Sequence, residues 1–452
     1  MNIHFIAIGG AAMHNLAISL HLKGHRVTGS DDEVFEPSRS RLAVHGLLPV
    51  DTGWHPEKIQ TGTDAVILGM HAREDNPELL RAQQLGLKIY SYPEFLFERT
   101  KNKTRVVIGG SHGKTTITSM IMYVLKQLSV SFDYMVGSQV EGFDTMLELN
   151  ENSKLAVFEG DEYLASPLDN RPKFHIYKPH IGLISGIAWD HINVFPTFEI
   201  YKEQFRKFID CIEPEGSLVY FEGDPELCKI AGDYPARISK IPYSAPDYSV
   251  KNGTVTLLDG KREIPLKIFG GHNMQNLAGA KTVCNLIGIS DNRFYKAIRH
   301  FKGSSKRLQL LGENKNTAVF LDFAHSPSKL RASTGAVKEL YPGRELVACF
   351  ELHTFSSLNK NFLDLYRGTM EAADLPVVFY SPETVKHKKL EEIMPEEIQR
   401  AFGDFRLKVY TDAAALQKYL FTGDWKQKNL LLMSSGNFSG LDYEQLLKFI
   451  IR

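Results

Sequence analysis

Residues 105–116 read Arg105-Val-Val-Ile-Gly-Gly-Ser-His-Gly-Lys-Thr-Thr116, an apolar run that enters a glycine-rich turn. A helical pattern follows at once, with apolar residues at positions 117, 120, 121, 124, 125 and 128. A strand and a turn that open a helix in this way form a cradle where backbone N–H groups converge on phosphate. Lys114 would reach the terminal phosphates, and the Thr115 hydroxyl would bind Mg²⁺. The stretch predicts a nucleoside triphosphate site; the alternative is an ordinary strand–helix turn.

The loop is a short version of the usual phosphate-binding pattern. Ile108 stands where the first glycine of the general pattern belongs, so the match is Gly110-x-x-Gly113-Lys114-Thr115. We assign the phosphate contacts to this loop and the start of its helix: Gly110, Ser111, His112, Gly113, Lys114, Thr115 and Thr116.

Composition excludes several classes of protein. The 452 residues are 43% hydrophobic and 23% charged, and Lys+Arg equals Asp+Glu at 53 each, so no overall basic field favours nucleic acid. The chain has no run of 18 apolar residues and begins with a strand-like segment, so we expect neither membrane insertion nor a signal peptide. The four cysteines are scattered without a C-x-x-C pair, which predicts reduced thiols and a cytoplasmic protein.

Three α/β blocks follow one another along the chain. Short apolar runs alternate with amphipathic helices, so we predict an α/β fold with three domains, each built on a mainly parallel, doubly wound sheet. The boundaries are 1–102 (Rossmann-like), 103–303 (central phosphate-loop domain) and 304–452 (Rossmann-like). Residues 100–103 and 302–305 are predicted hinges, and residues 236–269 a small antiparallel insert.

Acidic residues and a histidine follow the next two strands of the central block. Glu159, Asp161 and Glu162 come after the strand 155–158, where carboxylates are well placed for Mg²⁺; the alternative is a solvated acidic turn. Three carboxylates so close repel one another unless a cation lies between them. His191 follows the strand 181–185 beside Asp190, and is either a metal ligand or a structural histidine.

Further polar groups lie at the start of the helix predicted at 273–287. Others lie at the start of the third block. His272, Asn273 and Asn276 are candidates for contact with adenine, although this segment alone favours Asn273 as the helix N-cap. Arg307 and Asp322 lie beyond the second hinge and would close over the phosphates; surface or capping roles are the alternative.

The first block opens with an incomplete dinucleotide fingerprint. Gly9 and Gly10 are present, but Ala12 blocks the third glycine position, which argues against a nicotinamide dehydrogenase. The turn still allows a pyrophosphate at the helix N-terminus, with Ser30 and Asp31 near a ribose. We assign to this site Gly9, Gly10, Ala11, Ala12, Met13, Ser30 and Asp31.

In this order, the motifs resemble those of the Mur ligases of peptidoglycan synthesis over the whole chain. They are Gly110-Ser-His-Gly-Lys-Thr115, Glu159-Gly-Asp-Glu162, Asp190-His191, His272-Asn273-x-x-Asn276, Lys306-Arg307 and Asp322-Phe-Ala-His325. The resemblance implies that Lys114, Glu159 and His191 are catalytic, and that Thr115, Glu159 and His191 hold two Mg²⁺ ions. It also implies that the first domain binds the UDP part of UDP-N-acetylmuramate, and that the ATP contacts include His272, Asn273, Asn276, Arg307 and Asp322.

The implied reaction is ATP-dependent amide formation through an acyl phosphate, with release of ADP and phosphate. Four stretches favour L-alanyl-γ-D-glutamyl-meso-diaminopimelate as the amine: Val27–Asp31, Glu159–Tyr163, Lys306–Glu313 and Met433–Gly440. L-Alanine is the alternative, and the resemblance implies a monomer or weak dimer. A folylpolyglutamate-synthase-like ligase and a non-catalytic nucleotide-binding scaffold are the other possibilities. The full N-terminal domain argues against the first, and intact Lys114, Glu159 and His191 argue against the second.

Several positions depart from the family pattern. Ser111 replaces the usual threonine, Gly160 a common alanine, and Ser326 a second histidine. His353 stands where an arginine is expected. The identity of the amine substrate is therefore the least secure part of the assignment. We assign the amine side to His325, Glu351 and His353. Phe205 and Arg206 lie near the place of a metal-binding carbamylated lysine, a feature absent from the branches that use L-alanine or the tripeptide.

Overall fold

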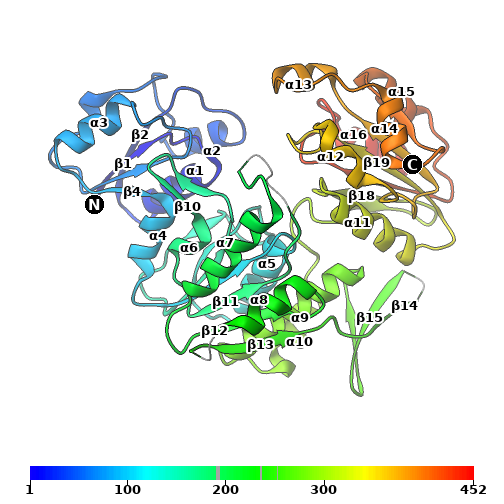
Figure 1. The fold of residues 1–452 in the computed structure, drawn as a ribbon, viewed down its shortest axis with the longest axis horizontal. Helices are drawn as coiled ribbons and strands as arrows, with labels where there is room; N and C mark the ends of the chain where they lie inside the picture. The colour runs from blue at the N-terminus through cyan, green and yellow to red at the C-terminus, as the bar shows by residue number, and fades with distance from the viewer. Residues whose placement is uncertain (190–193, 235–236, 252) are drawn as a thin grey trace. The chain divides into compact units, whose positions relative to one another are not determined.

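The computed structural model describes residues 1–189, 194–234, 237–251 and 253–452 (Figure 1). The chain forms two compact units. The first comprises Met1–Ala188, Phe198–Ser244 and Gly279–Phe294. The second comprises Trp189–Thr197, Ala245–Ala278 and Tyr295–Arg452. Among the described residues, no helix combines the length and hydrophobicity needed to cross a bilayer.

The first unit begins with a four-stranded parallel sheet in the order β2-β1-β3-β4. Its strands are β1 (Asn2–Ile6), β2 (Arg26–Ser30), β3 (Ala65–Leu68) and β4 (Ile89–Ser91). The connecting helices are α1 (Ala11–Leu22), α2 (Ser38–Val44), α3 (Pro77–Gln84) and α4 (Tyr92–Thr100). The last two begin where the sequence supplies caps. Asn76 accepts from Glu78 N and Leu79 N, and Ser91 forms a capping box with Glu94.

A seven-stranded sheet follows in the same unit, in the order β13-β12-β11-β5-β8-β6-β7. Its strands are β5 (Thr104–Gly109), β6 (Asp133–Met135), β7 (Leu147–Glu148), β8 (Leu155–Glu159), β11 (Ile181–Ile184), β12 (Ser217–Phe221) and β13 (Ser239–Tyr243). All pairs are parallel except β6–β7. Because β5 is central and pairs with β8 and β11, the loops that follow these three strands meet at one edge of the sheet.

Helices and a hairpin complete this part of the chain. They are α5 (Lys114–Gln127), β9 (Leu164–Ser166), β10 (Asp169–Pro172), α6 (Lys173–Ile176), α7 (Phe198–Asp210), α8 (Pro225–Asp233), α9 (Gly271–Leu286) and α10 (Asp291–Ile298). The antiparallel insert predicted at 236–269 is present in the second unit as β14 (Tyr248–Lys251), β15 (Thr254–Asp259) and β16 (Arg262–Leu266).

The second unit contains a six-stranded sheet in the order β17-β18-β22-β19-β20-β21. Its strands are β17 (Gln309–Glu313), β18 (Ala318–Asp322), β19 (Glu345–Glu351), β20 (Leu375–Phe379), β21 (Lys408–Tyr410) and β22 (Lys428–Met433). Only the edge strand β17 is antiparallel. The helices include α11 (Pro327–Leu340), α14 (Pro395–Phe402), α15 (Ala413–Thr422) and α16 (Tyr443–Ile450). The last two pack on a core that includes Val319, Cys349, Leu416, Leu430 and Leu446.

The predicted α/β class with mainly parallel sheets is confirmed. The boundaries 1–102, 103–303 and 304–452 stay a proposal, supported by the separate sheet in each interval. One local prediction is wrong: α9 begins at Gly271, so Asn273 is not its N-cap. Its side-chain amide instead donates to the carbonyl of Phe269, at 2.9 Å.

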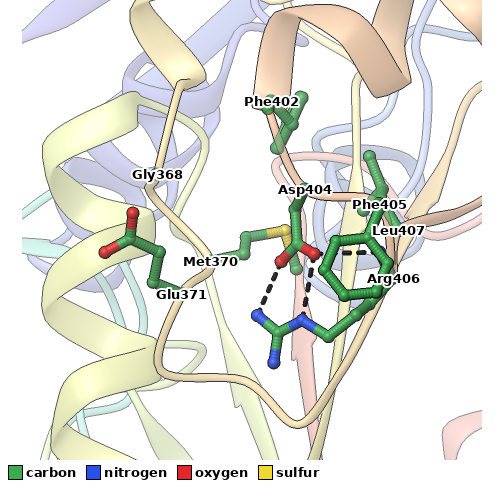
Figure 2. A pocket seen from close by; sticks show the side chains of 9 residues that line it. Gly368, Met370, Glu371, Phe402, Asp404, Phe405, Arg406 and Leu407 are labelled. Atoms are coloured by element: carbon green, nitrogen blue, oxygen red, sulfur yellow. Dashed lines mark hydrogen bonds and ion pairs between the residues drawn. The ribbon is translucent and has the colours of Figure 1, made fainter.

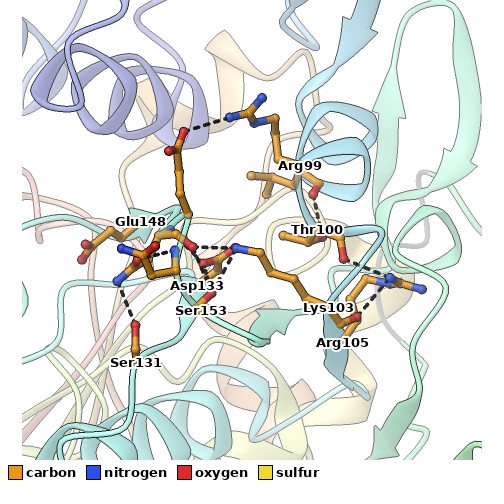
Figure 3. A network of polar contacts seen from close by, with 12 residues as sticks. Arg99, Thr100, Lys103, Arg105, Ser131, Asp133, Glu148 and Ser153 are labelled. Atoms are coloured by element: carbon orange, nitrogen blue, oxygen red, sulfur yellow. Dashed lines mark hydrogen bonds and ion pairs between the residues drawn. The ribbon is translucent and has the colours of Figure 1, made fainter.

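The segment predicted as the first hinge, residues 100–103, lies in a dense hydrogen-bond network (Figure 3). Lys103 Nζ donates to Asp133 Oδ2 at 2.7 Å and to Ser153 Oγ at 3.0 Å. The buried guanidinium of Arg105 donates to the carbonyls of Thr100, Lys101 and Lys103. A rotation about residues 100–103 would have to break these bonds, because they tie the segment to the central sheet.

Candidate functional site

The predicted phosphate cradle is present as a strand, a turn and a helix. β5 ends at Gly109, and α5 begins at Lys114 with Gly113 as its N-cap in the left-handed conformation (φ 76°). Gly110 has φ 121°, and a Cβ atom there would overlap Ser185 Oγ. Both positions therefore require glycine. The first N–H groups of α5 have no partner within their own helix, so they are available to an anion.

Lys114 lies at the entrance to α5 with its charge already partnered. Its ammonium donates to Gly110 O at 2.7 Å and to Glu162 Oε2 at 2.6 Å. Burial would lower the pKa of Lys114, but the carboxylates of Glu162 and Asp161 raise it above its usual value. The side chain therefore stays an ammonium group, as a phosphate ligand must.

A buried chain of hydroxyl groups continues from Glu162. Tyr201 OH donates to Glu162 Oε1 at 3.0 Å, and Ser111 Oγ lies 2.9 Å from Tyr201 OH. Ser111 Oγ also accepts from Ala188 N at 2.8 Å. Because Tyr201 donates its single proton to Glu162, Ser111 donates to Tyr201. Sequence reasoning missed Tyr201; the available signal was a tyrosine at a core position of an amphipathic helix, where the hydroxyl needs a partner.

Glu159, the last residue of β8, contacts Thr115 in the first turn of α5. Thr115 Oγ1 donates to Glu159 Oε1 at 2.8 Å, and Gly137 N donates to Glu159 Oε2 at 2.6 Å. A hydroxyl and a carboxylate in contact suit Mg²⁺, which takes few protein oxygens beside phosphate and water. His191, the third predicted ligand, lies outside the described residues. Within the described ranges, no three His, Cys, Asp or Glu side chains form a metal-binding group.

The three carboxylates of the acidic turn do not gather around one cation, contrary to one possibility left open by the sequence. Glu159 faces Thr115, Glu162 faces Lys114, and the third, Asp161, pairs with Lys173 at 2.7 Å. Separate partners remove the repulsion that three adjacent charges would suffer.

The glycine turn of the first sheet is held by Asp31. Gly9 N donates to Asp31 Oδ2 at 2.6 Å, while Gly10 caps α1 without a side-chain hydrogen bond. Burial raises the pKa of Asp31 to about 6; the bond from Gly9 opposes this shift, and neighbouring Asp32 adds to it. Ser30 is fully buried beside it. Ser30 and Asp31 thus adjoin the glycine turn, and one Asp31 oxygen supports its backbone. Their place near a ribose stays a prediction.

One cavity of about 330 Å³ joins the glycine turn to the acidic turn within the first unit. Its lining includes Gly10, Ala11, Ala12 and Met13 from the glycine turn, and Glu159 and Asp161 from the acidic turn. Two clusters that are about 150 residues apart in the sequence therefore face the same space.

The polar groups predicted near adenine belong to the second unit. Burial lowers the pKa of His272, and the charge of Asp322 partly opposes that shift. Asp322 accepts from Leu308 N at 3.0 Å and from the Ser333 hydroxyl. It therefore fixes the turn that carries Arg307, whose guanidinium lies 4.6 Å from the centre of the Phe323 ring. Asn276, also predicted there, is buried.

The predicted amine-side residues have internal partners in the same unit. Glu351, at the end of β19, accepts from the Ser434 hydroxyl and from Phe438 N at 2.9 Å. His353 Nδ1 lies 3.7 Å from Glu351 Oε1, and its side chain is 39% exposed. The ring of His325 is 2.9 Å from Phe323 O. Glu351 thus anchors the loop after β22, and the partly exposed His353 stands beside it.

A second cavity, of about 430 Å³, has none of the predicted site residues among the described residues that line it (Figure 2). It lies between residues 368–371 and 402–407 of the second unit. Asp404 and Arg406 form an ion pair at 2.7 Å, and the neighbouring Phe405 is 99% exposed. Arg406 is the only basic side chain among the described residues that line this cavity, and it is already paired. We therefore assign the cavity no part in nucleotide binding.

A phosphate cradle beside a threonine–carboxylate pair, at the edge of a parallel sheet, defines a P-loop nucleotide-dependent enzyme. Two family models match: "Mur ligase family, catalytic domain" over residues 2–104 and "Mur ligase middle domain" over residues 108–284. The chain belongs to the Mur ligase family, so it is an ATP-dependent ligase that forms an amide bond.

Individual relatives cover most of the chain. It is 33% identical over 392 residues to a UDP-N-acetylmuramate–L-alanine ligase from Caldicellulosiruptor saccharolyticus, covering 84% of this chain and 83% of that protein. The structure of a UDP-N-acetylmuramate–alanine ligase from Thermotoga maritima is similar with a TM-score of 0.73 at 22% identity, covering 100% and 98%. A murein peptide ligase from Psychrobacter arcticus gives a TM-score of 0.66 at 22% identity, with the same coverage. These structural similarities support the fold.

Proposed function

We propose that this chain joins L-alanine to the lactyl carboxylate of UDP-N-acetylmuramate at the expense of ATP. The observation that carries the proposal is the cavity shared by the glycine turn at residues 10–13 and by Glu159. A UDP-sugar held at the start of α1 would extend through this cavity toward the phosphate loop. The sequence relatives, named as L-alanine ligases, support L-alanine over the tripeptide that the sequence motifs favoured.

The proposed reaction solves one chemical problem. A carboxylate does not react with an amine, because its leaving group would be oxide. Transfer of the γ-phosphoryl group of ATP to the carboxylate gives an acyl phosphate, whose leaving group is phosphate. The neutral amine attacks the carbonyl carbon and loses a proton, and the tetrahedral intermediate collapses to amide and phosphate.

The chain's own groups have distinct parts in this proposal. The amides of the loop and Lys114 bind the β- and γ-phosphates and offset charge as the phosphoryl group moves. Thr115 and Glu159 offer the oxygen ligands for Mg²⁺, which when bound would neutralise phosphate charge. His191 as a second metal ligand, and His272, Asn273, Asn276, Arg307 and Asp322 as nucleotide contacts, stay part of the proposal. ATP and UDP-sugars are cytoplasmic metabolites, so we place the reaction there.

A second candidate has L-alanyl-γ-D-glutamyl-meso-diaminopimelate as the amine. The observation in its favour is the set of stretches quoted above, of which 433–440 is the loop anchored by Glu351. Both candidates share the acceptor and the activation step and differ only in the nucleophile.

The test supplies ATP, Mg²⁺ and UDP-N-acetylmuramate, and measures phosphate release with L-alanine, with the tripeptide or with no amine. Mass spectrometry of the UDP-linked product identifies the bond formed. Turnover with L-alanine supports the first candidate, and turnover with the tripeptide alone replaces it with the second. Amine-dependent turnover that does not need the UDP-sugar would contradict both.

A further inference from the structure

Lys173 is a partly buried cation at the wall of the shared cavity. It begins α6, directly after the β9–β10 hairpin, and its side chain is 15% exposed. Its ammonium donates to Asp161 Oδ2 at 2.7 Å and lies 5.6 and 5.9 Å from the ring centres of Tyr92 and Tyr163. Two aromatic faces and a carboxylate therefore hold the charge in one place.

The charges that line the cavity indicate a role for Lys173 in binding an anion. Among the described residues that line it, Lys173 is the only lysine or arginine, whereas Glu159 and Asp161 are both acidic. The proposed acceptor carries a pyrophosphate and a carboxylate. An anion that enters a partly desolvated space beside two carboxylates needs a cation there.

The ammonium group of Lys173 also has N–H donors that are available to a ligand. An ammonium group carries three donors, and within the described part of the chain Asp161 is its only hydrogen-bond acceptor. Burial would lower the pKa of Lys173, but the charge of Asp161 raises it, so the group stays charged. Two N–H donors thus remain for a ligand in the cavity.

We infer that Lys173 binds the lactyl carboxylate of the acceptor and holds it beside Glu159. This inference rests on the proposed function. The first N–H groups of α1 suit the pyrophosphate, because they have no partner within their own helix and residues 10–13 line the cavity. Lys173 is paired with Asp161 on the same acidic turn as Glu159, the proposed Mg²⁺ ligand, and all three line the cavity. The reacting carboxylate has to meet the γ-phosphoryl group near that ligand. Lys173 therefore distinguishes a UDP-sugar that carries a carboxylate from one that lacks it.

The test compares calorimetric binding of UDP-N-acetylmuramate with that of UDP-N-acetylglucosamine, which has no lactyl group. Loss of one charge-assisted hydrogen bond should weaken binding of the first ligand to Lys173→Gln by about 10- to 100-fold. Binding of the second should stay within about twofold of wild type, since it never contacts the ammonium. Lys173→Arg should restore most of the preference, because it keeps the charge.

Matched variants separate binding from folding. Lys178→Gln removes an exposed lysine that also lies over a ring, that of Phe97 at 5.4 Å, and should leave both affinities unchanged. Asp161→Asn/Lys173→Gln replaces the ion pair by a neutral pair, so it should fold even where the single variant does not, and should still lose the preference.

Two results would overturn the inference. Either Lys173→Gln and the double variant keep the wild-type preference for UDP-N-acetylmuramate, or they lose affinity for both ligands equally. A different result would refute the proposed function: wild-type protein that binds neither UDP-sugar and forms no UDP-linked amide. The inference about Lys173 would then also be refuted.

Discussion

Tyr201→Phe tests whether the buried hydroxyl chain sets the position of the phosphate-loop lysine. The substitution removes one oxygen and leaves the ring in place, where it packs against Phe205 with ring centres 5.2 Å apart. Among the described residues, the substitution removes the bond donated to Glu162 and the bond shared with Ser111. Glu162, which accepts from Lys114, then loses the hydrogen bond from Tyr201.

The expected loss of folding stability follows from the groups to which the Tyr201 hydroxyl is hydrogen-bonded. A hydrogen bond to a charged group contributes about 1.5–3 kcal/mol and one between neutral groups about 0.5–1.5 kcal/mol, so the variant should lose about 2–4 kcal/mol of stability. For a unit of this size that corresponds to a fall in Tm of about 4–16 °C. A less well oriented Lys114 should raise the KM for ATP by about tenfold, equivalent to about 1.4 kcal/mol. The KM for the UDP-sugar should not change, because the affected side chains do not line its cavity.

Scanning calorimetry and initial-rate kinetics measure these quantities, with Tyr380→Phe as the matched control. Tyr380 is buried in the second unit, and its hydroxyl donates only to the carbonyl of Ile393 among the described residues. That control should lose about 1 kcal/mol and keep its KM for ATP. The reasoning is refuted where Tyr201→Phe destabilises no more than the control, or where it does so with an unchanged KM for ATP.

Three further substitutions test other parts of the site. Lys114→Ala should abolish turnover and keep a cooperative unfolding transition; full activity in a phosphate-release assay would disprove the ATP site. Gly110→Ala should cost about 2–4 kcal/mol, because its Cβ would overlap Ser185 at φ 121°; urea unfolding with a wild-type midpoint would contradict this. Asp31→Asn tests a pH dependence: the folded-state pKa of about 6 lies above the ordinary 3.8, so ionisation of Asp31 reduces stability as pH rises from about 4 to 6. The stability of the Asp31→Asn variant relative to wild type should therefore increase by about 1–2 kcal/mol across that interval, after screening, and a difference independent of pH would refute the burial argument.

Prediction from the sequence succeeded where one local pattern determines both the backbone structure and the chemistry. The turn at 109–114 is such a case, because its glycines are required by backbone angles and its helix begins directly after it. The parallel arrangement followed from alternating strands and helices, and it brought Thr115 beside Glu159 as expected.

The same reasoning could not distinguish a ligand contact from an internal anchor. Asp322 and Glu351 both end strands, where α/β proteins assemble their sites, yet both accept hydrogen bonds from the chain itself. The donor to Glu351 comes from Phe438, 87 residues later, and no local pattern reveals that pairing. Tyr201 and Lys173 were missed for the same reason, since their roles depend on partners that only the folded chain brings near.

The acidic turn explains how neighbouring carboxylates can serve three separate purposes. Gly160 lies between them, and a Cβ there would come within 2.8 Å of Val107 Cγ1 and 3.0 Å of Phe174 Cβ. The absence of a side chain lets the backbone pass close to β5 and turn sharply. Glu159 then points to Thr115, Asp161 to Lys173 and Glu162 to Lys114. In the proposed reaction Thr115 binds the metal, Lys173 the acceptor carboxylate and Lys114 the phosphates. One turn would therefore position the metal and both reacting groups.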